Sequence, residues 1–345
     1  MVNIGLIGCG YWGPNLIRNF SQIKGCNMHS CSDLREDRLA HMKSLYPNLQ
    51  TTKDYKEIIE NQKIDAVVIA TPVSTHYKIA KEALESNKNV LIEKPITKTS
   101  AEAKELISLA KKHGKVLMVD HTFEYNSAVK KIRELIAKGE LGNIYTIDMV
   151  RVNLGLFQKD INVVEDLLPH DASILMRLLG EMPEKVKTTA EAYVQKGIED
   201  SAYITLKFKN KAMANIHVSW LDPCKIRRTT IVGSKKMLVY DDLEPNEKLK
   251  IYDKGVSVEN AGEAGRKYYD TFAEFQYLYR SGDVYSPKLE DSEPLRNVCV
   301  HFIDCIKSGK APLSGGVSGL RVVKVVEAAL ESLRNSGKEI AVNEE

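Results

Sequence analysis

A glycine-rich segment near the N-terminus has the residue types and spacing that could hold a dinucleotide. Gly8, Gly10 and Gly13 form a G-x-G-x-x-G pattern, with Tyr11 and Trp12 between the last two glycines. The first glycine permits a tight turn, the second lets a pyrophosphate approach the backbone, and the third lets a helix pack closely on a strand. An apolar run precedes the pattern and helical spacing follows it, so the phosphates would meet the positive end of a helix. We therefore predict dinucleotide binding, with all five residues at the cofactor site.

Asp33 indicates which dinucleotide this would be. It stands at the end of a second apolar run, where a carboxylate can bond free ribose hydroxyls but would repel a 2′-phosphate. NAD is therefore favoured over NADP. Arg35 and Arg38 leave an alternative open, because a guanidinium can pair with that phosphate or lie over the adenine, and both could equally form a solvated helix start. We include Arg38 among the expected cofactor contacts.

Three later segments place polar side chains where ligands could reach them. They are Ala70-Thr71-Pro72 with His76, Glu93-Lys94-Pro95, and Asp166 with His170. The first two stand at the carboxyl ends of predicted strands, where open α/β sheets bind ligands. Lys94, between an apolar strand and a proline, would be held close to the nicotinamide. Taken alone, Lys94 is better explained by an ion pair with Glu93 or another carboxylate.

The elements that must position these residues alternate in type up to about residue 120. Apolar runs predict strands at residues 4–7, 28–32, 66–70, 90–92 and 116–119, and helical spacing is found at residues 16–23, 79–84 and 101–112. Alternation of this kind predicts a parallel sheet covered on both faces. We expect a doubly wound, Rossmann-type domain at residues 1–121.

Beyond residue 122 the pattern changes to that of an α/β domain with a mostly antiparallel open sheet, at residues 122–345. Helices are predicted near residues 128–138 and 173–179, strands at 186–193, 203–208, 212–219, 229–232 and 237–241, and closing helices near 295–308 and 317–336. Successive strands without intervening helices favour antiparallel pairing. An aromatic string at residues 268–279 is expected to pack in a core or interface. The closing helices could pack back on the first domain.

Length and composition exclude several classes of protein. The chain has 345 residues, 43% of them hydrophobic, with 49 Lys plus Arg against 46 Asp plus Glu, a net charge of +3. That balance predicts no nucleic-acid partner and no membrane-binding face. No spacing of His, Cys and Asp suggests a metal. Six scattered cysteines without a C-x-x-C pair are expected as reduced thiols in a cytoplasmic protein.

Four motifs in this order resemble the glucose-fructose oxidoreductase / inositol dehydrogenase family. They are the G-x-G-x-x-G, the A-T-P-x-x-x-H stretch from Ala70 to His76, the E-K-P triplet from Glu93 to Pro95, and the D-x-x-x-H pair of Asp166 and His170. The likeness runs nearly the whole length of the chain. It implies a Rossmann domain, an α/β domain whose open sheet faces the nicotinamide and often builds the subunit interface, and a homo-oligomer, dimer or tetramer.

The resemblance also implies roles for individual residues. Lys94 and His170 would be the catalytic pair at the reacting sugar carbon, and Asp166 would orient the substrate or the histidine. Thr71, Pro72, His76, Glu93 and Lys94 would lie at the cofactor, His76 by contact or by packing beside it. The family also often has a cis bond before the proline of E-K-P, which here is Lys94-Pro95.

The residue types suit the oxidation of a secondary alcohol, which needs a base for the hydroxyl proton while hydride leaves the carbon. Imidazole has an ordinary pKa near 6.5, so His170 suits that role. A neighbouring Lys94 ammonium would stabilise the developing alkoxide and hold the imidazole neutral. The reverse assignment, with Lys94 as the base, remains an alternative.

Within the family, the chain is most similar to nucleotide-sugar 3-dehydrogenases. The residues behind this are the segment from Gly10 to Asn15, Asn153-Leu154-Gly155, Asn162, and the segment from Asp166 to Ile174. The resemblance implies oxidation of the C3 hydroxyl of UDP-N-acetylglucosamine or its uronate for surface-glycan synthesis. We expect Lys94, Arg151, Asn153, Asn162, Asp166 and His170 at the substrate, although Arg151, Asn153 and Asn162 could equally be strand and loop polar residues.

Two departures from the family pattern affect the sugar pocket. Glu124-Tyr125-Asn126 stands where many relatives have an arginine, and Glu165 where an aromatic residue is common. The alternatives are an inositol or free-sugar dehydrogenase, a dTDP-ketosugar reductase, or a non-catalytic NAD-binding regulator. The presence of both Lys94 and His170 argues against the regulator.

Overall fold

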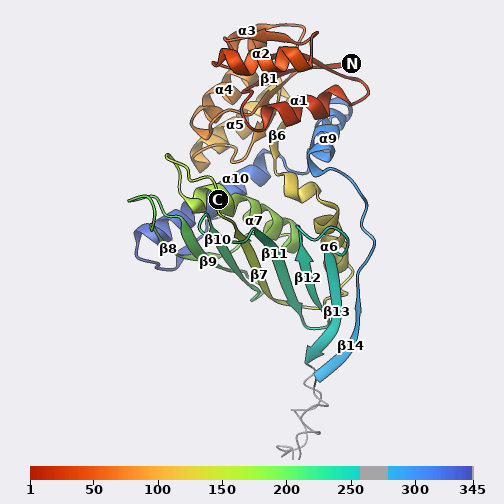
Figure 1. The fold of residues 1–345 in the computed structure, drawn as a ribbon, viewed down its shortest axis with the longest axis vertical. Coiled ribbons are helices and arrows are strands. Elements are labelled where there is room, and N and C mark those ends of the chain that lie inside the picture. The colour runs from red at the N-terminus through yellow and green to blue at the C-terminus, as the bar shows by residue number, and fades with distance from the viewer. Residues whose placement is uncertain (257–278, 344–345) are drawn as a thin grey trace, which may run out of the picture. The chain divides into compact units, whose positions relative to one another are not determined.

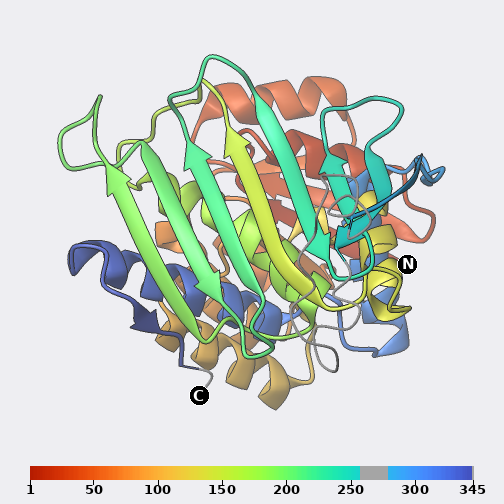
Figure 2. The same cartoon turned by 90° about the horizontal axis from the view of Figure 1, so that it is seen from below.

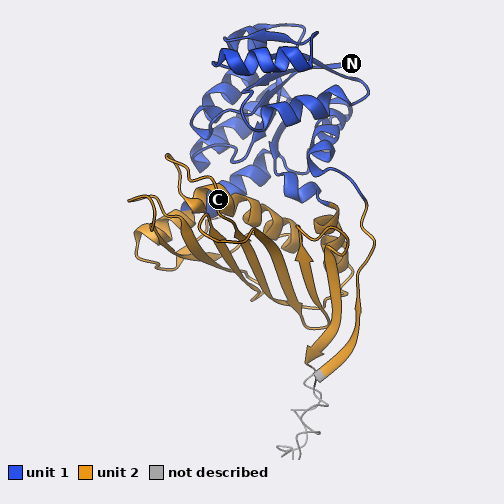
Figure 3. Cartoon of the chain, viewed as in Figure 1, with its two compact units in different colours: residues 1–126, 291–327 blue, residues 127–290, 328–345 orange. Residues whose placement is uncertain are grey.

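The computed structural model describes residues 1–256 and 279–343, and divides the chain into two compact units. The first comprises residues 1–126 and 291–327, and the second residues 127–290 and 328–345 (Figure 3). The aromatic residues of the predicted string from Tyr268 to Tyr277 lie outside the described residues.

The first unit contains a six-stranded parallel sheet of order β3-β2-β1-β4-β5-β6. Its strands are β1 (Val2–Ile7), β2 (Cys26–Ser32), β3 (Gln50–Thr52), β4 (Ala66–Ile69), β5 (Asn89–Glu93) and β6 (Leu117–Asp120). Between them lie α1 (Gly13–Ser21), α2 (Glu36–Leu45), α3 (Lys56–Glu60), α4 (Val73–Glu85) and α5 (Ser100–His113), with the 3₁₀ turn η1 (Thr122–Tyr125) after β6 (Figure 1). The predicted doubly wound, Rossmann-like domain is confirmed, and β3 is a strand that the pattern did not reveal.

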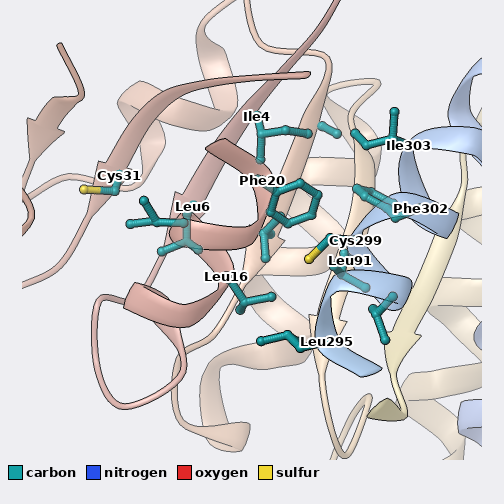
Figure 4. Packing of buried hydrophobic residues seen from close by; sticks show 14 of the residues in the cluster. Ile4, Leu6, Leu16, Phe20, Cys31, Leu91, Leu295, Cys299, Phe302 and Ile303 are labelled. Atoms are coloured by element: carbon teal, nitrogen blue, oxygen red, sulfur yellow. The ribbon is translucent and has the colours of Figure 1, made fainter. Parts of the chain in front are cut away.

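The core of this unit contains residues from both ends of the chain. One hydrophobic cluster joins Leu16 and Phe20 of α1 to Val298 and Phe302 of α9 (Pro294–Ser308), as Figure 4 shows for the labelled members. The rings of Phe20 and Phe302 meet edge to face at 6.4 Å. Arg18 and Asn19 of α1 also bond the Glu293 carboxylate that precedes α9.

The predicted division after residue 121 therefore differs from the compact units of the structure. Residues 122–126 and 291–327 belong to the first unit, because η1 and α9 complete the apolar layer over its sheet. The last helix, α10 (Gly316–Arg334), begins in the first unit and ends in the second.

The second unit contains a nine-stranded sheet of order β14-β13-β12-β11-β7-β10-β9-β8-β15 among the described residues. Its strands are β7 (Ile144–Val152), β8 (Lys185–Glu191), β9 (Ser201–Lys207), β10 (Met213–Ser219), β11 (Ile226–Gly233), β12 (Met237–Asp241), β13 (Leu249–Val256), β14 (Tyr279–Tyr285) and β15 (Ile340–Ala341), and its helices are α6 (Ser127–Ala137) and α7 (Val163–Leu179). Among the described residues, the β7–β10 pair is parallel and the other neighbouring strands of this sheet pair antiparallel, which confirms a mixed, mostly antiparallel sheet.

Helix α7 lies against one face of this sheet (Figure 2). Ile147 and Met149 of β7 are buried while Asp148 between them is exposed, the alternation of a strand with one covered face. The strands β7, β13 and β14 were not predicted, although β7 carries this alternation in its sequence.

Candidate active site

The glycine-rich loop has the geometry that its sequence predicted. Gly8 has φ +100°, and a Cβ there would lie 2.5 Å from the Ala70 carbonyl oxygen. A Cβ at Gly13 would collide with the Gly8 carbonyl oxygen, whereas one at Gly10 would meet nothing within 4 Å. Two glycines thus fit a tight strand–helix crossing, and Gly10 leaves the backbone open to an incoming group. Helix α1 has no acidic residue in its first turn and no side-chain cap, so its positive end is free of competing carboxylates.

Asp33 stands directly beside this loop. Its carboxylate accepts hydrogen bonds from the backbone N–H of Cys9 at 2.7 Å and from that of Arg35 at 2.9 Å. Each oxygen retains a further lone pair, so the side chain can still accept from ribose hydroxyls. The same carboxylate therefore orders the loop and offers the interaction that favours NAD.

A cavity of about 520 Å³ opens at the carboxyl ends of β1, β2 and β4. Its lining includes the predicted residues Gly8, Gly10, Asp33, Thr71 and Pro72. This is the edge of the sheet where the strand order reverses around β1 and β4, the position at which doubly wound sheets bind nucleotides. The open backbone at Gly10, the Asp33 carboxylate and the cavity together fit the adenosine half of NAD.

The lining also contains residues that the sequence did not single out: Ser32, Leu34, Lys53, Tyr55 and Thr75. Lys53 follows the short strand β3, which the sequence pattern did not predict, and its Nζ lies 2.6 Å from Glu36 Oε2.

Arg35 lines the cavity, whereas Arg38 does not belong to the lining and its Nε lies 3.7 Å from Asp37 Oδ2. The alternative that Arg38 starts a solvated helix fits this placement better than a cofactor contact does.

Tyr11 and Trp12 lie at the tip of the glycine-rich loop. Their side chains are 79% and 41% exposed, and their rings meet edge to face at 5.3 Å. They stand outside the cavity lining, so their contact with the cofactor stays a prediction.

The His76 imidazole of α4 contacts the segments that follow the neighbouring strands β4 and β5. Its Nδ1 lies 2.8 Å from the Pro95 carbonyl oxygen and its Nε2 lies 2.8 Å from the Thr71 carbonyl oxygen. Burial lowers the pKa of this imidazole. His76 is 1% exposed, which favours packing beside the cofactor site over direct contact with it.

Lys94 follows β5 directly, and the Lys94-Pro95 peptide bond is cis, as the resemblance implied. The adjoining carboxyl of Glu93 is paired in register with Asp120 at the end of β6. Burial and the neighbouring Asp120 raise the pKa of Glu93 well above its usual range, and burial raises the pKa of Asp120 to about 6. Glu93 therefore belongs to a carboxyl pair beside Lys94.

In the second unit, Asp166 and His170 lie one turn apart on α7, which places them on the same face. The helix starts ten residues earlier than predicted, so both residues are inside it and not ahead of it. Asn162 caps the helix by accepting from the N–H groups of Val164 and Glu165, both at 3.1 Å. Glu165 completes the capping box by accepting from the Asn162 N–H.

The Asp166 carboxylate accepts a hydrogen bond from the indole N–H of Trp220 at 3.1 Å. Trp220 is 2% exposed and its ring meets Phe157 edge to face at 5.7 Å. The indole therefore fixes the orientation of the carboxylate that shares a helix face with His170. Sequence reasoning missed Trp220 because the contact joins β10 to α7 across the fold.

Arg151 is committed to Asp171, the residue after His170. Its guanidinium bonds that carboxylate through three contacts of 2.7 to 3.0 Å, and the two side chains are 8% and 2% exposed. Asn162 likewise uses its oxygen in the helix cap and its Nδ2 on Glu199. The alternative interpretation of both residues as structural polar groups thus fits the structure better than sugar contacts do, while Asn153 is half-buried beside Trp220.

The predicted site residues are divided between the units. The cofactor residues and Lys94 belong to the first, and Arg151, Asn153, Asn162, Asp166 and His170 to the second. Among the described residues, no three His, Cys, Asp or Glu side chains gather as metal ligands. No helix in the described ranges is long and apolar enough to span a membrane.

The glycine-rich turn, the Asp33 carboxylate and the cavity at the switch point define the first unit as that of an NAD-binding oxidoreductase. Two family models agree: the "Oxidoreductase family, NAD-binding Rossmann fold" matches residues 2–121, and the "GFO/IDH/MocA C-terminal domain" matches residues 129–239. The chain belongs to the GFO/IDH/MocA oxidoreductase family.

Known proteins similar to this chain include several of equal length. Myo-inositol 2-dehydrogenase of Thermotoga maritima is 26% identical, over 96% of each chain, and the uncharacterized oxidoreductase YrbE of Bacillus subtilis is 26% identical over 95% of this chain and 93% of its own. Among solved structures, UDP-N-acetylglucosamine 3-dehydrogenase GnnA of Acidithiobacillus ferrooxidans has a TM-score of 0.79 at 23% identity, over 96% of this chain and 98% of its own. At that identity the likeness to GnnA shows the fold alone.

Proposed function

We propose that this NAD-binding oxidoreductase oxidises the C3 hydroxyl of a UDP-linked amino sugar, UDP-N-acetylglucosamine or its uronate, to the 3-keto sugar for surface-glycan synthesis. The observation that carries the proposal is the pairing of Asp166 with His170 on one face of α7, with the carboxylate held by Trp220. A fixed carboxylate one turn from an imidazole is an arrangement suited to orienting a base or a sugar hydroxyl.

In the proposed reaction, His170 removes the hydroxyl proton at its imidazole while the hydride leaves the same carbon. NAD bound by the first unit supplies the hydride acceptor. Lys94, as an ammonium at the end of β5, stabilises the oxygen as it becomes an alkoxide. Asp166 orients the imidazole or an adjacent hydroxyl. The proposal requires Lys94 and His170 to meet at one carbon when the substrate is bound.

The choice of a nucleotide sugar rests on two supports. The segments around Asn153 and from Asp166 to Ile174 resemble nucleotide-sugar 3-dehydrogenases, and a solved 3-dehydrogenase shares the fold. In this chain the Asn153 segment is tied to β10, because the N–H of Asn153 bonds the Ser219 carbonyl oxygen and that of Gly155 bonds the Trp220 carbonyl oxygen. Two segments of the resemblance thus meet at Trp220.

The test is reduction of NAD, followed by absorbance, with purified protein and a panel of alcohols. We expect turnover with UDP-N-acetylglucosamine or its uronate and none with UDP-glucose as the matched control without the amide. A ketone at C3, identified by mass spectrometry after borodeuteride reduction, would fix the position of oxidation. Turnover of neither UDP-hexosamine would refute the substrate assignment.

A second candidate is an inositol dehydrogenase, which the 26% identity to the Thermotoga maritima enzyme favours. It predicts NAD reduction with myo-inositol or a free sugar in the same panel. A dTDP-ketosugar reductase would consume NADH instead, and a regulator would bind NAD without turnover of any member of the panel.

We further propose that the protein acts in the cytoplasm as a dimer or tetramer, with residues 1–121 and 122–345 serving as cofactor-binding and substrate-binding regions. All six cysteines are free thiols, which fits a reducing compartment. Light scattering at several protein concentrations tests the assembly, and a monomer throughout would refute it.

A further inference from the structure

A pair of carboxyl groups lies at the ends of the two strands that flank Lys94 in the first unit. Glu93 ends β5 and Asp120 ends β6, and the two are register partners in the parallel sheet. Their side chains therefore project from neighbouring strands at the same level, within hydrogen-bonding reach of one another. Asp120 is 2% exposed, so water does not separate it from its neighbours.

In the described part of the chain, one oxygen atom of each carboxyl group in this pair has no hydrogen-bond donor. Asp120 Oδ1 accepts from the Thr122 hydroxyl at 2.6 Å, and Glu93 accepts from the Lys94 backbone. Among the described residues, buried Glu93 Oε1 and buried Asp120 Oδ2 find no donor. Two buried acceptors without a donor would each cost about 1–3 kcal/mol. A single acid proton between the two carboxyl groups satisfies both oxygens.

The surrounding groups favour the same protonation state. Burial and the repulsion between two neighbouring carboxylates strongly raise the pKa of one of them, which favours one proton held between the pair. The charges that act on Glu93 are Asp120 and Lys94. Tyr125 and Cys299 interact electrostatically with Asp120, and His121 follows Asp120 in the chain. Burial lowers the pKa of His121 and raises those of Tyr125 and Cys299, so all three are neutral at pH 7.

We propose that Glu93 and Asp120 share one proton and act as a singly charged unit that flanks and positions Lys94. This deepens the proposed function, because it assigns Lys94 to stabilising the alkoxide and leaves the role of base to His170. Glu93 carries the proton and donates it to Asp120 Oδ2. Asp120 keeps the negative charge, which the Thr122 hydroxyl stabilises. The shared proton stays on the pair during the reaction, so no group has to be regenerated.

The proposal makes an unusual prediction for amide variants. In Glu93→Gln the amide N–H takes the place of the acid proton and donates to the Asp120 carboxylate. In Asp120→Asn the amide donates to the Glu93 carboxylate. Each single variant thus keeps one negative charge and one hydrogen bond, while the double variant keeps the hydrogen bond and removes the charge.

The experiment measures how fast the Lys94 amine is acetylated, without any substrate. Competitive acetylation at one fixed pH, with mass spectrometry of the Lys94 peptide, gives that rate in the wild type, both single variants and the double variant. We expect the single variants to match the wild type and the double variant to react faster, because a neighbouring negative charge favours the unreactive ammonium. Glu105→Gln, which removes an exposed carboxylate from the same unit, is the matched control.

Difference infrared spectroscopy at neutral pH tests the proton directly. The wild type should show the carbonyl band of a protonated carboxyl, which shifts in D₂O, and either single variant should lose it. Circular dichroism and the thermal unfolding transition verify that each variant is folded. A wild type without that band, or a Glu93→Gln variant acetylated at Lys94 as fast as the double variant, would overturn the proposal. Neither readout requires turnover, so a wrong sugar assignment would leave this test intact.

Discussion

Lys94 is placed by the residues on both sides of it. Buried Val90, Leu91 and Ile92 hold β5 between β4 and β6, and Pro95 follows immediately afterwards, with its carbonyl oxygen 2.8 Å from His76 Nδ1. A long cationic side chain is thereby held at a sheet edge by a rigid main chain. Such positioning is what electrostatic stabilisation of an alkoxide requires.

Replacing Lys94 by Met should separate binding from catalysis. Methionine preserves the length of the side chain but removes the charge, so we expect NAD to bind while turnover falls by about 10²–10³-fold, the usual effect of losing one such group. Calorimetric titration with NAD and steady-state kinetics measure the two quantities. Lys81→Met, at an exposed site of the same unit, is the control, and unchanged turnover in Lys94→Met would refute the catalytic assignment.

His121 should impose a pH dependence on stability. Burial lowers its pKa to about 3, against about 6.5 in the unfolded chain. Between those values the unfolded state binds one more proton, so the free energy of unfolding falls as the pH drops, by up to about 1.4 kcal/mol per pH unit. Above pH 6.5 the His121 imidazole is neutral in both states, so it no longer lowers the free energy of unfolding. Asp120, whose pKa is raised to about 6, acts in the opposite sense over part of this range.

Urea denaturation of the wild type and of His121→Gln between pH 4 and 7 measures this effect. Both proteins retain Asp120, so its contribution is common to them. We expect the stability of the wild type to depend more steeply on pH than that of the variant. Parallel curves would show that the folded imidazole titrates normally.

At this scale, sequence reasoning succeeded where a residue's role is local. The turn at Gly8 and the carboxylate of Asp33 depend on their own backbone and on adjoining strands, so spacing was enough to find them. Lys53 and Trp220 were missed because their contacts are set by the tertiary fold. Arg151 gave a polar signal, but only the structure revealed Asp171 as its partner.

A buried ion pair connects helix α7 to the sheet. It joins the Arg151 guanidinium of β7 to the Asp171 carboxylate of α7, and Arg227 of β11 is the register partner of Arg151. Because Asp171 follows His170, this pair fixes the height and rotation of the helix at the proposed base.

Replacing only Arg151 should lower the free energy of unfolding more than replacing both members of the ion pair. Arg151→Met leaves the Asp171 carboxylate buried without its cation, which typically costs about 3–5 kcal/mol, whereas Arg151→Met with Asp171→Leu leaves no charge behind. We therefore expect the double variant to be more stable than the single one in urea denaturation. Exposed Lys185→Met, which loses a surface pair with Glu339, is the control and should change stability far less than Arg151→Met does.

The start of α7 shows why an element was predicted short. Asn162 and Glu165 have the spacing of a capping box, which marks a helix start, whereas Pro169 inside the segment is a residue that disfavours a continuous helix. The helix continues through it, and the Ser173 hydroxyl bonds the His170 carbonyl oxygen in that region. The local start signal was reliable, and the breaker signal was overridden by the packing of Leu168, Ala172 and Leu175.

The first unit is assembled from two distant parts of the chain. Residues 1–126 supply the sheet, and residues 291–327 supply α9, which covers Leu16 and Phe20. The alternation of strands and helices predicted the sheet, since each strand and its helix are neighbours in sequence. The alternation did not predict the boundary, because the return of residues 291–327 depends on contacts across 164 intervening positions.

This arrangement predicts how fragments behave. Residues 1–126 alone should fail to give a cooperative unfolding transition, since α1 would expose its apolar side. The same residues joined through a flexible Gly/Ser linker to residues 291–327 should fold and bind NAD. Circular dichroism and NAD titration measure both. A well-folded, NAD-binding 1–126 fragment would contradict the structural role given to α9.

The same arrangement has a consequence for synthesis on the ribosome. At about 5–20 residues per second, the segment that completes the cofactor-binding unit is made roughly 8–33 s after residue 126 emerges. During that interval the nascent sheet lacks its last helix, while residues 127–290, whose strands pair mainly with near neighbours, are already available to fold. The part of the protein translated first therefore cannot be completed until residues 291–327 are made, and nascent chains stalled before residue 291 should be unable to retain NAD.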